Sequence, residues 1–389
     1  MKLDGPKPSR CVLLSEMLQP YRLPVFNRLA ERSDLVFQVL LLSIKESNRK
    51  WDVDLDQVRF NYELLPHVDL YIRALDYGFH LNRGVRSALD RANPDVIVGT
   101  GYTSPTYWIA QRYARRRGIG YVLWSGSTEN SSRMGRFPIR WAKSRFVRRC
   151  HSFLAYGSAA ERYLVSLGAE PKRVVRGMNT VDVEAFSRSA ERASRDPEMP
   201  EWRKRFPERN VLFVGQMIPR KGVPELIEAF RAVSNEGFGL ILVGDGPMWE
   251  KYKAEYAKVP GLFWEGYRQP LELSRYYAVA DALVMPSKLE VWGLVVNEAM
   301  ASGLPVIATT CSGATEDLIL EGETGAAYES GDTAALTRLL TSVVEDPKRW
   351  KTMGSNAAER IRRFGPECYA ESFCRAVRTA YDVSRGKLD

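Results

Sequence analysis

Short apolar runs alternate along most of the chain with segments of helical hydrophobic spacing. In the first half, the runs at 11–15, 35–42, 95–98, 121–124 and 152–156 are typical of buried strands, and 60–65 has the alternating pattern of a further strand. Helix-forming segments at 24–31, 105–117 and 158–167 separate several of them. Strands that alternate with helices favour a mostly parallel sheet, so the pattern predicts an α/β fold.

The second half repeats this order. Apolar strands are predicted at 210–214, 239–243, 262–265, 281–285 and 306–308, and helices at 223–234, 333–345, 347–363 and 366–385. Between the halves, residues 184–208 are polar and contain three prolines, which is typical of a linker, here with one short helix. Two α/β domains joined by this linker are therefore expected.

One stretch of the second half combines charge with a helix start. Glu290 and Glu298 lie eight positions apart, and a helix-forming segment begins between them at Gly293. Gly303 and Pro305 then end that helix. The loop follows the predicted strand 281–285, and open α/β sheets bind ligands at the carboxyl ends of their strands. The free N–H groups of the helix start suit a phosphate.

Two further loops follow strands in the same half. The loop from Gly215 to Gly222 carries Arg220 and Lys221 just before a helix, and two cations beside a helix start favour a diphosphate over a single charge. After the strand 262–265 come Tyr267 and Arg268, whose ring and guanidinium could stack on a nucleobase.

Other motifs are weaker. The acids from Asp52 to Asp56 resemble a metal-binding D-x-D, but they occupy a polar connection instead of a phosphate pocket. The pair Gly99 and Gly101 follows a strand without the third glycine of a dinucleotide fingerprint, so it indicates only a turn that a substrate can approach closely. Five cysteines without a C-x-x-C pair favour the reducing cytoplasm and no structural zinc.

Charge is distributed unevenly along the chain. The net charge is +9, and residues 1–190 hold 30 Lys and Arg against 18 Asp and Glu. Seven of these cations lie within 133–149, on a predicted amphipathic helix that starts at Pro138. This helix either packs on the core with a solvated side or docks on an anionic membrane surface. No nucleic-acid recognition motif accompanies it.

No apolar run is long enough to cross a bilayer, and the polar N-terminus lacks the apolar core of a signal peptide. The location predicted on these grounds is the cytoplasm, peripheral on the inner face of the membrane.

Four motifs resemble one family. They are V-G-x5-K-G at 214–222, V-G-D-G-P at 243–247, A-D-A-L-V-M-P-S at 280–287, and E-x7-E at 290–298 inside W-G-L-V-V-N-E-A-M-A-S-G-L-P-V-I. In this order they resemble the retaining glycosyltransferases of family 4, which have the GT-B fold. The resemblance is strong over the second half and loose over the first, where it rests on the β-α order and the loop Pro20-Tyr21-Arg22.

The resemblance implies two Rossmann-like domains with parallel sheets that face a central cleft. The acceptor-binding domain would span 1–183, the linker 184–208 and the donor-binding domain 209–365, with a C-terminal helix at 366–389 that crosses back to the first domain. The donor would be a nucleotide-diphosphate sugar, with no metal and no other cofactor.

The same resemblance assigns roles to individual residues. Glu298 would bind the ribose hydroxyls and Glu290 the hydroxyls of the donor sugar, while Arg220 and Lys221 would hold the diphosphate. The remaining donor-side residues are Gly215, Tyr267, Arg268, Gly293, Leu294 and Val295, and the acceptor-side residues are Tyr21, Arg22, Gly101 and Ser125.

Two positions depart from the family pattern. Gln216 stands where family members often have Arg, and Arg220 could replace that charge. Ser125-Gly126 stands where many members place a His, and the histidines of this chain are at 67, 80 and 151.

The expected function is retaining transfer of a sugar to a lipid-linked or polysaccharide acceptor at the cytoplasmic membrane face. Transfer to a small soluble acceptor and nucleotide-sugar binding without catalysis stay open as alternatives.

Overall fold

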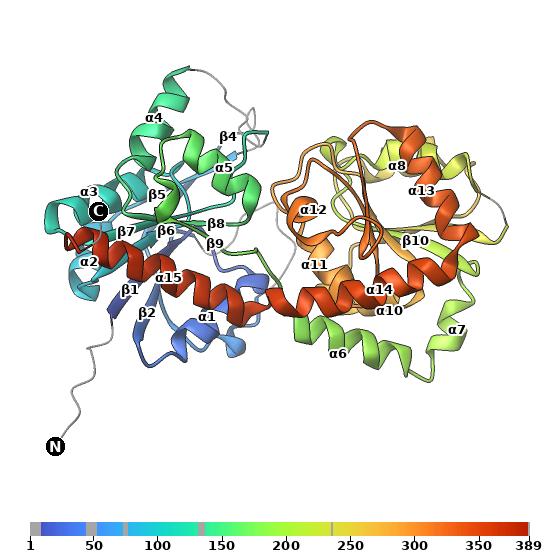
Figure 1. The fold of residues 1–389 in the computed structure, drawn as a ribbon, viewed down its shortest axis with the longest axis horizontal. Helices are drawn as coiled ribbons and strands as arrows, with labels where there is room; N and C mark the ends of the chain where they lie inside the picture. The colour runs from blue at the N-terminus through green and yellow to red at the C-terminus, as the bar shows by residue number, and fades with distance from the viewer. Residues whose placement is uncertain (1–8, 44–52, 73–76, 131–136, 235, 388–389) are drawn as a thin grey trace. The chain divides into compact units, whose positions relative to one another are not determined.

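The computed structural model describes residues 9–43, 53–72, 77–130, 137–234 and 236–387. The chain forms two compact units (Figure 1). The first comprises Met1–Met178 together with Pro366–Asp389, and the second comprises Asn179–Gly365. The first unit is therefore built from two separate stretches of the chain, whereas the second is continuous.

A seven-stranded parallel sheet forms the centre of the first unit, in the order β3-β2-β1-β6-β7-β8-β9. Its strands are β1 (Ser9–Ser15), β2 (Leu35–Leu41), β3 (Asn61–Leu64), β6 (Val96–Gly99), β7 (Gly120–Ser125), β8 (Ser152–Ala155) and β9 (Val174–Arg176). Its helices are α1 (Leu23–Ala30), α2 (Val85–Ala92), α3 (Pro105–Arg117), α4 (Phe137–Val147), α5 (Ser158–Ser166) and α15 (Pro366–Ser384). An antiparallel hairpin of β4 (His67–Ile72) and β5 (Tyr77–Asn82), which the apolar pattern did not predict, lies between β3 and α2 along the chain.

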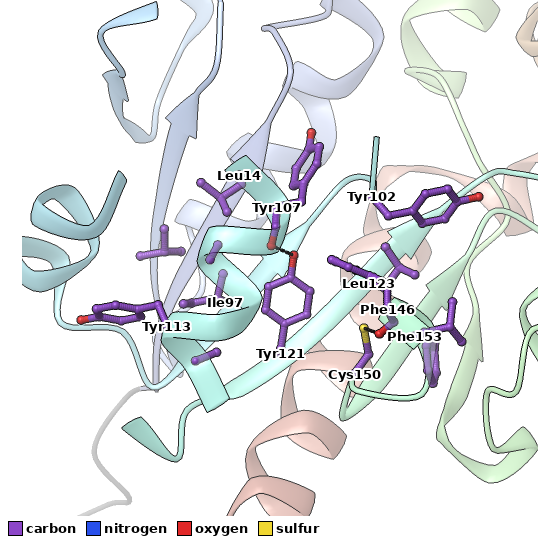
Figure 2. Close-up of a cluster of buried hydrophobic side chains, with 14 of the residues drawn as sticks. Leu14, Ile97, Tyr102, Tyr107, Tyr113, Tyr121, Leu123, Phe146, Cys150 and Phe153 are labelled. Carbon is purple, nitrogen blue, oxygen red and sulfur yellow. Dashed lines mark hydrogen bonds between the residues drawn. The ribbon is translucent and has the colours of Figure 1, made fainter. Parts of the chain in front are cut away.

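The inner strands β1, β6, β7 and β8 are buried on both faces, which explains why they are almost continuous apolar runs, whereas the edge strand β3 is mostly exposed. On one face, Tyr107 of α3 and Tyr121 of β7 pack with Phe146 near the end of α4 (Figure 2). Successive β1 residues alternate between the faces: Val12 joins this cluster, whereas Cys11 and Leu13 join the opposite one. Parallel strands need helices on both sides, and the alternation supplies an apolar surface to each.

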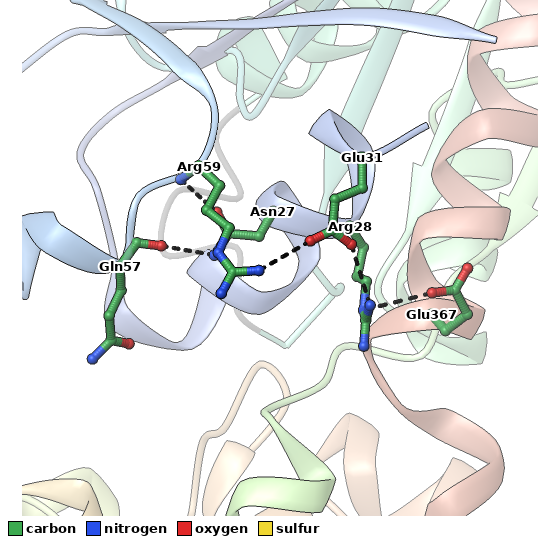
Figure 3. A network of polar contacts seen from close by, with 6 residues as sticks. All are labelled: Asn27, Arg28, Glu31, Gln57, Arg59 and Glu367. Atoms are coloured by element: carbon green, nitrogen blue, oxygen red, sulfur yellow. Dashed lines mark hydrogen bonds and ion pairs between the residues drawn. The ribbon is translucent and has the colours of Figure 1, made fainter. Parts of the chain in front are cut away.

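The opposite face is covered by α1 and α15. Phe373 of α15 lies with its ring centroid 5.9 Å from Phe37 and 5.8 Å from Trp124, and the Trp124 indole N–H donates to the Tyr369 hydroxyl. Toward solvent, the guanidinium of Arg28 reaches Glu31 and Glu367, which connects α1 with α15 (Figure 3). Exposed ion pairs of this kind contribute little, so the buried rings hold α15 in place.

Asn27 of α1 ties that helix to the loop before β3. Its side-chain N–H donates to the Gln57 carbonyl at 2.8 Å, and its side-chain oxygen accepts from the Arg59 N–H at 2.9 Å (Figure 3). Upstream of this loop, Asp54 uses its carboxylate to cap a short 3-10 turn at Leu55–Gln57. Asp54 therefore has a structural role, while Asp52 of the D-x-D motif lies outside the described residues.

Phe373→Ala is expected to lower the free energy of unfolding by about 3–5 kcal/mol, because it removes a buried ring and leaves a cavity under α15. Cys368→Ala is the matched control: it lies on the same helix, but its side chain is exposed, and a change within about 0.5 kcal/mol is expected. Urea titration of the full chain measures both. Equal stability of the two variants would show that α15 does not anchor the core.

The second unit contains a six-stranded parallel sheet in the order β12-β11-β10-β13-β14-β15. Its strands are β10 (Arg209–Val214), β11 (Phe238–Val243), β12 (Leu262–Gly266), β13 (Ala282–Met285), β14 (Val306–Thr309) and β15 (Gly325–Tyr328). Its helices are α6 (Val183–Ser194), α7 (Met199–Arg203), α8 (Val223–Arg231), α9 (Trp249–Glu255), α10 (Ser274–Val279), α11 (Leu294–Ala301), α12 (Gly313–Leu318), α13 (Thr333–Glu345) and α14 (Pro347–Ile361).

The strand order reverses at β10. The chain moves from β10 outward through β11 to β12 and then returns to place β13 on the other side of β10. The loops after β10 and β13 therefore diverge at the carboxyl edge of the sheet, and such a switch point is where open α/β sheets bind ligands. Parallel sheets with helices on both faces, together with α15 in the first unit, confirm the predicted fold class.

Some boundaries differ from those expected. Residues 184–208 were expected to form a linker with one short helix, but they contain most of α6 and all of α7, and α6 packs on α10 and α11 of the second unit. The amphipathic face of α6, with Val183 and Phe186 buried, explains this packing. Residues 313–318 form the short helix α12, for which the sequence analysis predicted no helix.

Candidate functional site

Two loops of the second unit meet at the switch point between β10 and β13. The loop after β10 makes a 3-10 turn at Pro219–Lys221 and passes through Gly222 into α8. The loop after β13 lies against it, because the Lys288 N–H donates to the Arg220 carbonyl at 2.8 Å. The predicted diphosphate loop and the predicted Glu290 loop are thus brought together.

Glycines allow this close approach. Gly222 has φ of +70°, and a Cβ there would lie 2.0 Å from the Pro286 carbonyl oxygen. Gly244, in the loop after β11, has φ of +139°, and its Cβ would lie 1.9 Å from the carbonyl oxygen of Gly215. The glycines of V-G-x5-K-G and V-G-D-G-P therefore serve backbone packing between neighbouring loops.

Gly222→Ala is expected to lower the free energy of unfolding by about 3 kcal/mol or more. Two costs add: the alanine must adopt a left-handed conformation, and the two loops must move apart to admit its methyl group. Gly303→Ala provides the control: φ there is +79°, but no atom lies within 4 Å of the added Cβ. The free energy of unfolding of Gly303→Ala should fall by only about 1 kcal/mol. Urea unfolding compares them, and similar losses would mean that the two loops tolerate the added methyl group.

Glu290 and Lys221 form a half-buried ion pair, in which the Lys221 ammonium donates to a Glu290 carboxylate oxygen. The Arg220 guanidinium lies 3.9 Å from the same oxygen and donates to the Leu289 carbonyl at 3.2 Å. Burial acts to raise the pKa of Glu290, but Lys221 and then Arg220 outweigh it, and the pKa is lowered from its ordinary value. The carboxylate is therefore ionised at neutral pH beside two cations.

The N-terminus of α11 follows Glu290 closely along the chain. Gly293 caps it with φ of +94°, and a Cβ there would lie 2.7 Å from the Met285 sulfur. The Trp292 carbonyl accepts from the Ser312 hydroxyl and from the Ala314 N–H at 3.0 Å, which fixes the loop. The first N–H groups of a helix, here those of Leu294 and Val295, have no partner within it and attract an anion.

Glu298 lies one turn further into α11. Its carboxylate accepts from the hydroxyl of Tyr277 on α10 at 2.9 Å. Burial raises the pKa of Glu298 to about 7, an effect that the Tyr277 hydrogen bond only partly offsets. Glu298 and Glu290 therefore have opposite pKa shifts, which the E-x7-E spacing alone did not indicate. Tyr277 is a functional candidate that the sequence analysis missed, since nothing in the spacing links it to a residue 21 positions later.

Tyr267 and Arg268 follow β12, two strands from β10. Arg268 donates through Nε to the Tyr276 hydroxyl at 3.0 Å and through Nη1 to the Tyr267 carbonyl at 3.0 Å. Its third partner is Glu265 at 3.5 Å. The guanidinium is thus held in place by the protein itself, and base recognition by these two residues stays a prediction.

The predicted acceptor-side residues all belong to the first unit. The Arg22 guanidinium is buried over the Trp124 ring at 4.3 Å and donates to the Tyr156 hydroxyl, so it supports the fold, while Tyr21 beside it is half-buried. Ser125 is buried at the end of β7 and accepts from the Ser127 N–H at 3.2 Å. Gly101 is packed by the Tyr107 ring, which would lie 3.3 Å from an added Cβ.

The described residues contain neither a cluster that could hold a metal ion nor a helix that could span a membrane. Within 9–43, 53–72, 77–130, 137–234 and 236–387, no three His, Cys, Asp or Glu residues are grouped so that they could hold a metal ion. In the same residues, no helix combines the length and the apolar character that crossing a bilayer requires. Arg133 and Arg136 of the basic segment lie outside the described residues.

The family of the second unit follows from comparison with known proteins. Residues 194–360 match the model of the family described as glycosyl transferases group 1. Residues 194–360, most of the second unit, belong to this family. The group 1 segment contains both site loops, Tyr277 and all of α11. The predicted recognition is thereby confirmed.

Relatives and a solved structure extend this result. The group 1 chain is 32% identical over 238 residues to sulfoquinovosyl transferase SQD2 of Arabidopsis thaliana, covering 58% of this chain and 44% of that protein. It is 31% identical over 211 residues to the D-inositol 3-phosphate glycosyltransferase of Corynebacterium glutamicum, covering 50% and 49%. The chain thus spans about half the length of the curated relatives it matches.

The crystal structure of Anabaena Alr3699/HepE in complex with UDP is similar over 95% of this chain and 99% of that one, with a TM-score of 0.73 and 17% identity. That likeness concerns the fold.

Proposed function

We propose that the chain is a retaining glycosyltransferase that takes a sugar from a nucleotide-diphosphate sugar and transfers it without a metal ion. The observation that carries this proposal is the arrangement at the switch point of the second unit. Lys221 and Arg220 lie beside Glu290, and Glu298 lies about one turn into α11, so positive charge adjoins two carboxylates with opposite pKa shifts. The names of the group 1 relatives, which are transferases of sugars, support it.

The positive groups fit the charge that develops during transfer. When the bond between the anomeric carbon and the diphosphate oxygen breaks, negative charge grows on the leaving diphosphate. Lys221, Arg220 and the N–H groups of Leu294 and Val295 would stabilise that charge from fixed positions. The new bond to the acceptor oxygen forms on the face that the diphosphate leaves, and the acceptor proton passes to the leaving phosphate oxygen.

The two carboxylates would orient the donor. Glu290, ionised beside Lys221, can accept hydrogen bonds from hydroxyls of the sugar. Glu298, half-buried on α11, can accept from the ribose hydroxyls once it ionises. Holding both ends of the donor reduces the entropy cost of reaching the reactive geometry. Neither role requires a glutamate to act as general acid, unlike in glycoside hydrolases.

For the acceptor, we propose a lipid-linked or polysaccharide molecule at the cytoplasmic face of the membrane. The support is the charge of the first half, where residues 1–190 carry 30 cations against 18 acids, and the side chain of Trp141 on α4, which is 57% exposed among cationic residues. An exposed tryptophan on a basic helix suits a membrane interface. The similarity to a D-inositol 3-phosphate glycosyltransferase favours a second candidate, a small soluble acceptor.

Thermal unfolding with UDP, GDP and ADP tests the donor proposal, since a ligand that binds the folded state raises the melting temperature. One of the three nucleotides is expected to raise the melting temperature. The sugar donor that carries the same nucleotide should then release its nucleoside diphosphate when an acceptor is added. No shift with any nucleotide and no release would contradict the proposal.

The anomeric configuration of the product, measured by NMR, tests retention. Co-sedimentation with anionic vesicles at low salt separates the two acceptor classes, because a soluble acceptor requires no vesicle binding.

A further inference from the structure

A pocket of about 420 Å³ opens on the first unit between α3 and α4. Five arginines line it: Arg112, Arg115, Arg116, Arg145 and Arg149. They come from the last turns of both helices and from the residues just after α4. No residue of the candidate donor site belongs to this pocket.

The floor of the pocket is fixed by buried hydrogen bonds. Gln111 is buried and donates to the Phe146 carbonyl at 2.9 Å, which joins α3 to α4. The Trp108 indole N–H donates to the Tyr102 carbonyl at 2.8 Å, and its ring lies 4.8 Å from that of Phe146. The arginines therefore project from two helices that are held at a set separation.

The positive charge of this pocket is uncompensated. Among the described residues, none of the five lining arginines forms an ion pair with a carboxylate, whereas the adjacent Arg117 pairs with Asp90 at 2.8 Å. Desolvation and then the neighbouring Arg145, Arg115 and Arg112 lower the pKa of Arg149. Five cations held together without a counter-charge repel one another, and a multiply charged anion would remove that cost.

The position in the fold separates this pocket from the acceptor-side residues. The helix α3 begins at the carboxyl edge of the sheet, after β6, and runs antiparallel to the strands, so its last turn reaches the opposite edge. The end of α4 lies at that same edge, since β8 starts five residues later. Gly101 and Ser125, at the carboxyl ends of β6 and β7, lie at the other end of the strands.

We propose that this pocket binds a cluster of phosphate groups. Planar guanidinium groups bind phosphate oxygens through two parallel hydrogen bonds, and five of them around a small pocket match several adjacent phosphates better than one. The phosphates can belong to a soluble polyphosphate or to a lipid headgroup that carries two of them. This inference is independent of the activity proposed for the second unit.

The variant Arg145→Ala/Arg149→Ala tests the site. Titration calorimetry of the full chain with inorganic tripolyphosphate is expected to show binding that the double variant weakens by about 150-fold or more, the usual scale for two charge-assisted hydrogen bonds. Arg83→Ala/Arg86→Ala removes the same charge from exposed positions of the same unit and should bind like the wild type. Lys221→Ala should also retain this binding, which excludes the diphosphate loop as its origin.

Vesicles distinguish the two sources. If a lipid supplies the phosphates, phosphatidylcholine vesicles containing cardiolipin should bind the protein better than phosphatidylglycerol vesicles of equal charge, and the Arg145→Ala/Arg149→Ala protein should lose the difference. The proposal is overturned if the folded double variant binds tripolyphosphate and cardiolipin vesicles as the wild type does. It is also overturned if the Arg83→Ala/Arg86→Ala control loses binding equally, because diffuse charge would then explain it.

Discussion

Lys221→Ala is expected to lower the turnover number about 100- to 1000-fold, the scale seen when one preorganised group that stabilises transition-state charge is removed. Its ammonium contacts Glu290 and lies on the loop that the proposal assigns to the diphosphate. Single-turnover formation of nucleoside diphosphate at saturating donor measures the effect. A turnover number within threefold of the wild type would remove Lys221 from the catalytic groups.

The same substitution affects stability, because Glu290 then remains half-buried with only Arg220 nearby. A loss of about 3 kcal/mol is expected from breaking this half-buried ion pair, whose side chains are only 15% and 13% exposed. The double variant Lys221→Ala/Glu290→Gln should regain much of that stability while staying slow, which separates folding from catalysis. Lys288→Ala is the matched control: its ion pair with Glu225 is more exposed, so both readouts should change little.

Glu298→Gln is expected to weaken nucleotide binding about 10- to 100-fold at pH 8, the scale of a hydrogen bond to a charged acceptor. The pKa of Glu298 is about 7, so in the wild type the affinity should rise as the pH increases from 6 to 8 and the carboxylate ionises. In the glutamine variant this pH dependence should disappear. Calorimetric titration with the preferred nucleotide across this range measures both effects, and an unchanged pH profile would contradict the ribose role.

Tyr277→Phe sharpens this prediction. The Tyr277 hydroxyl donates to the carboxylate and favours its ionised form, so its removal should shift the midpoint of the pH profile upward. A variant with the midpoint of the wild type would show that the two groups are not coupled.

Glu298 also predicts a pH dependence of stability. Its pKa is raised from 4.5 to about 7 in the folded protein, so the folded state retains a proton that the unfolded chain releases. The free energy of unfolding should therefore fall as the pH rises through this window, by about 3 kcal/mol in total. Urea unfolding at pH 5 and pH 8 should show this loss in the wild type relative to Glu298→Gln.

The fold was largely predictable because parallel strands buried on both faces leave a strong local pattern. The runs at 210–214, 239–243 and 281–285 match β10, β11 and β13 closely. The segment 184–208 was misjudged because its prolines and charges suggested a linker, whereas Val183 and Phe186 bury one face of α6 on α10 and α11. That contact depends on residues far along the chain, which composition does not report.

The sequence predicted which loops form the candidate site, but it predicted few of the contacts that the site residues make. The motifs placed Lys221 and Glu290 in loops that follow strands of the same half, and the structure pairs those strands and brings the two residues into contact. The hydrogen bond from Tyr277 to Glu298 and the burial of Arg22 over Trp124 come from tertiary packing, for which the sequence has no local signal. The Arg22 guanidinium packs on the Trp124 ring, and its acceptor-side role stays a prediction.

The contribution of α15 to the first unit has a consequence for synthesis on the ribosome. Phe373, Val377 and Ala380 belong to the same buried cluster as Cys11 and Leu13, yet they emerge only after the whole of 179–365 has been made. The second unit, whose strands and helices are contiguous, can complete its core first. The nascent first unit must wait with one apolar face uncovered, so it is the part of the chain on which a chaperone would act during translation.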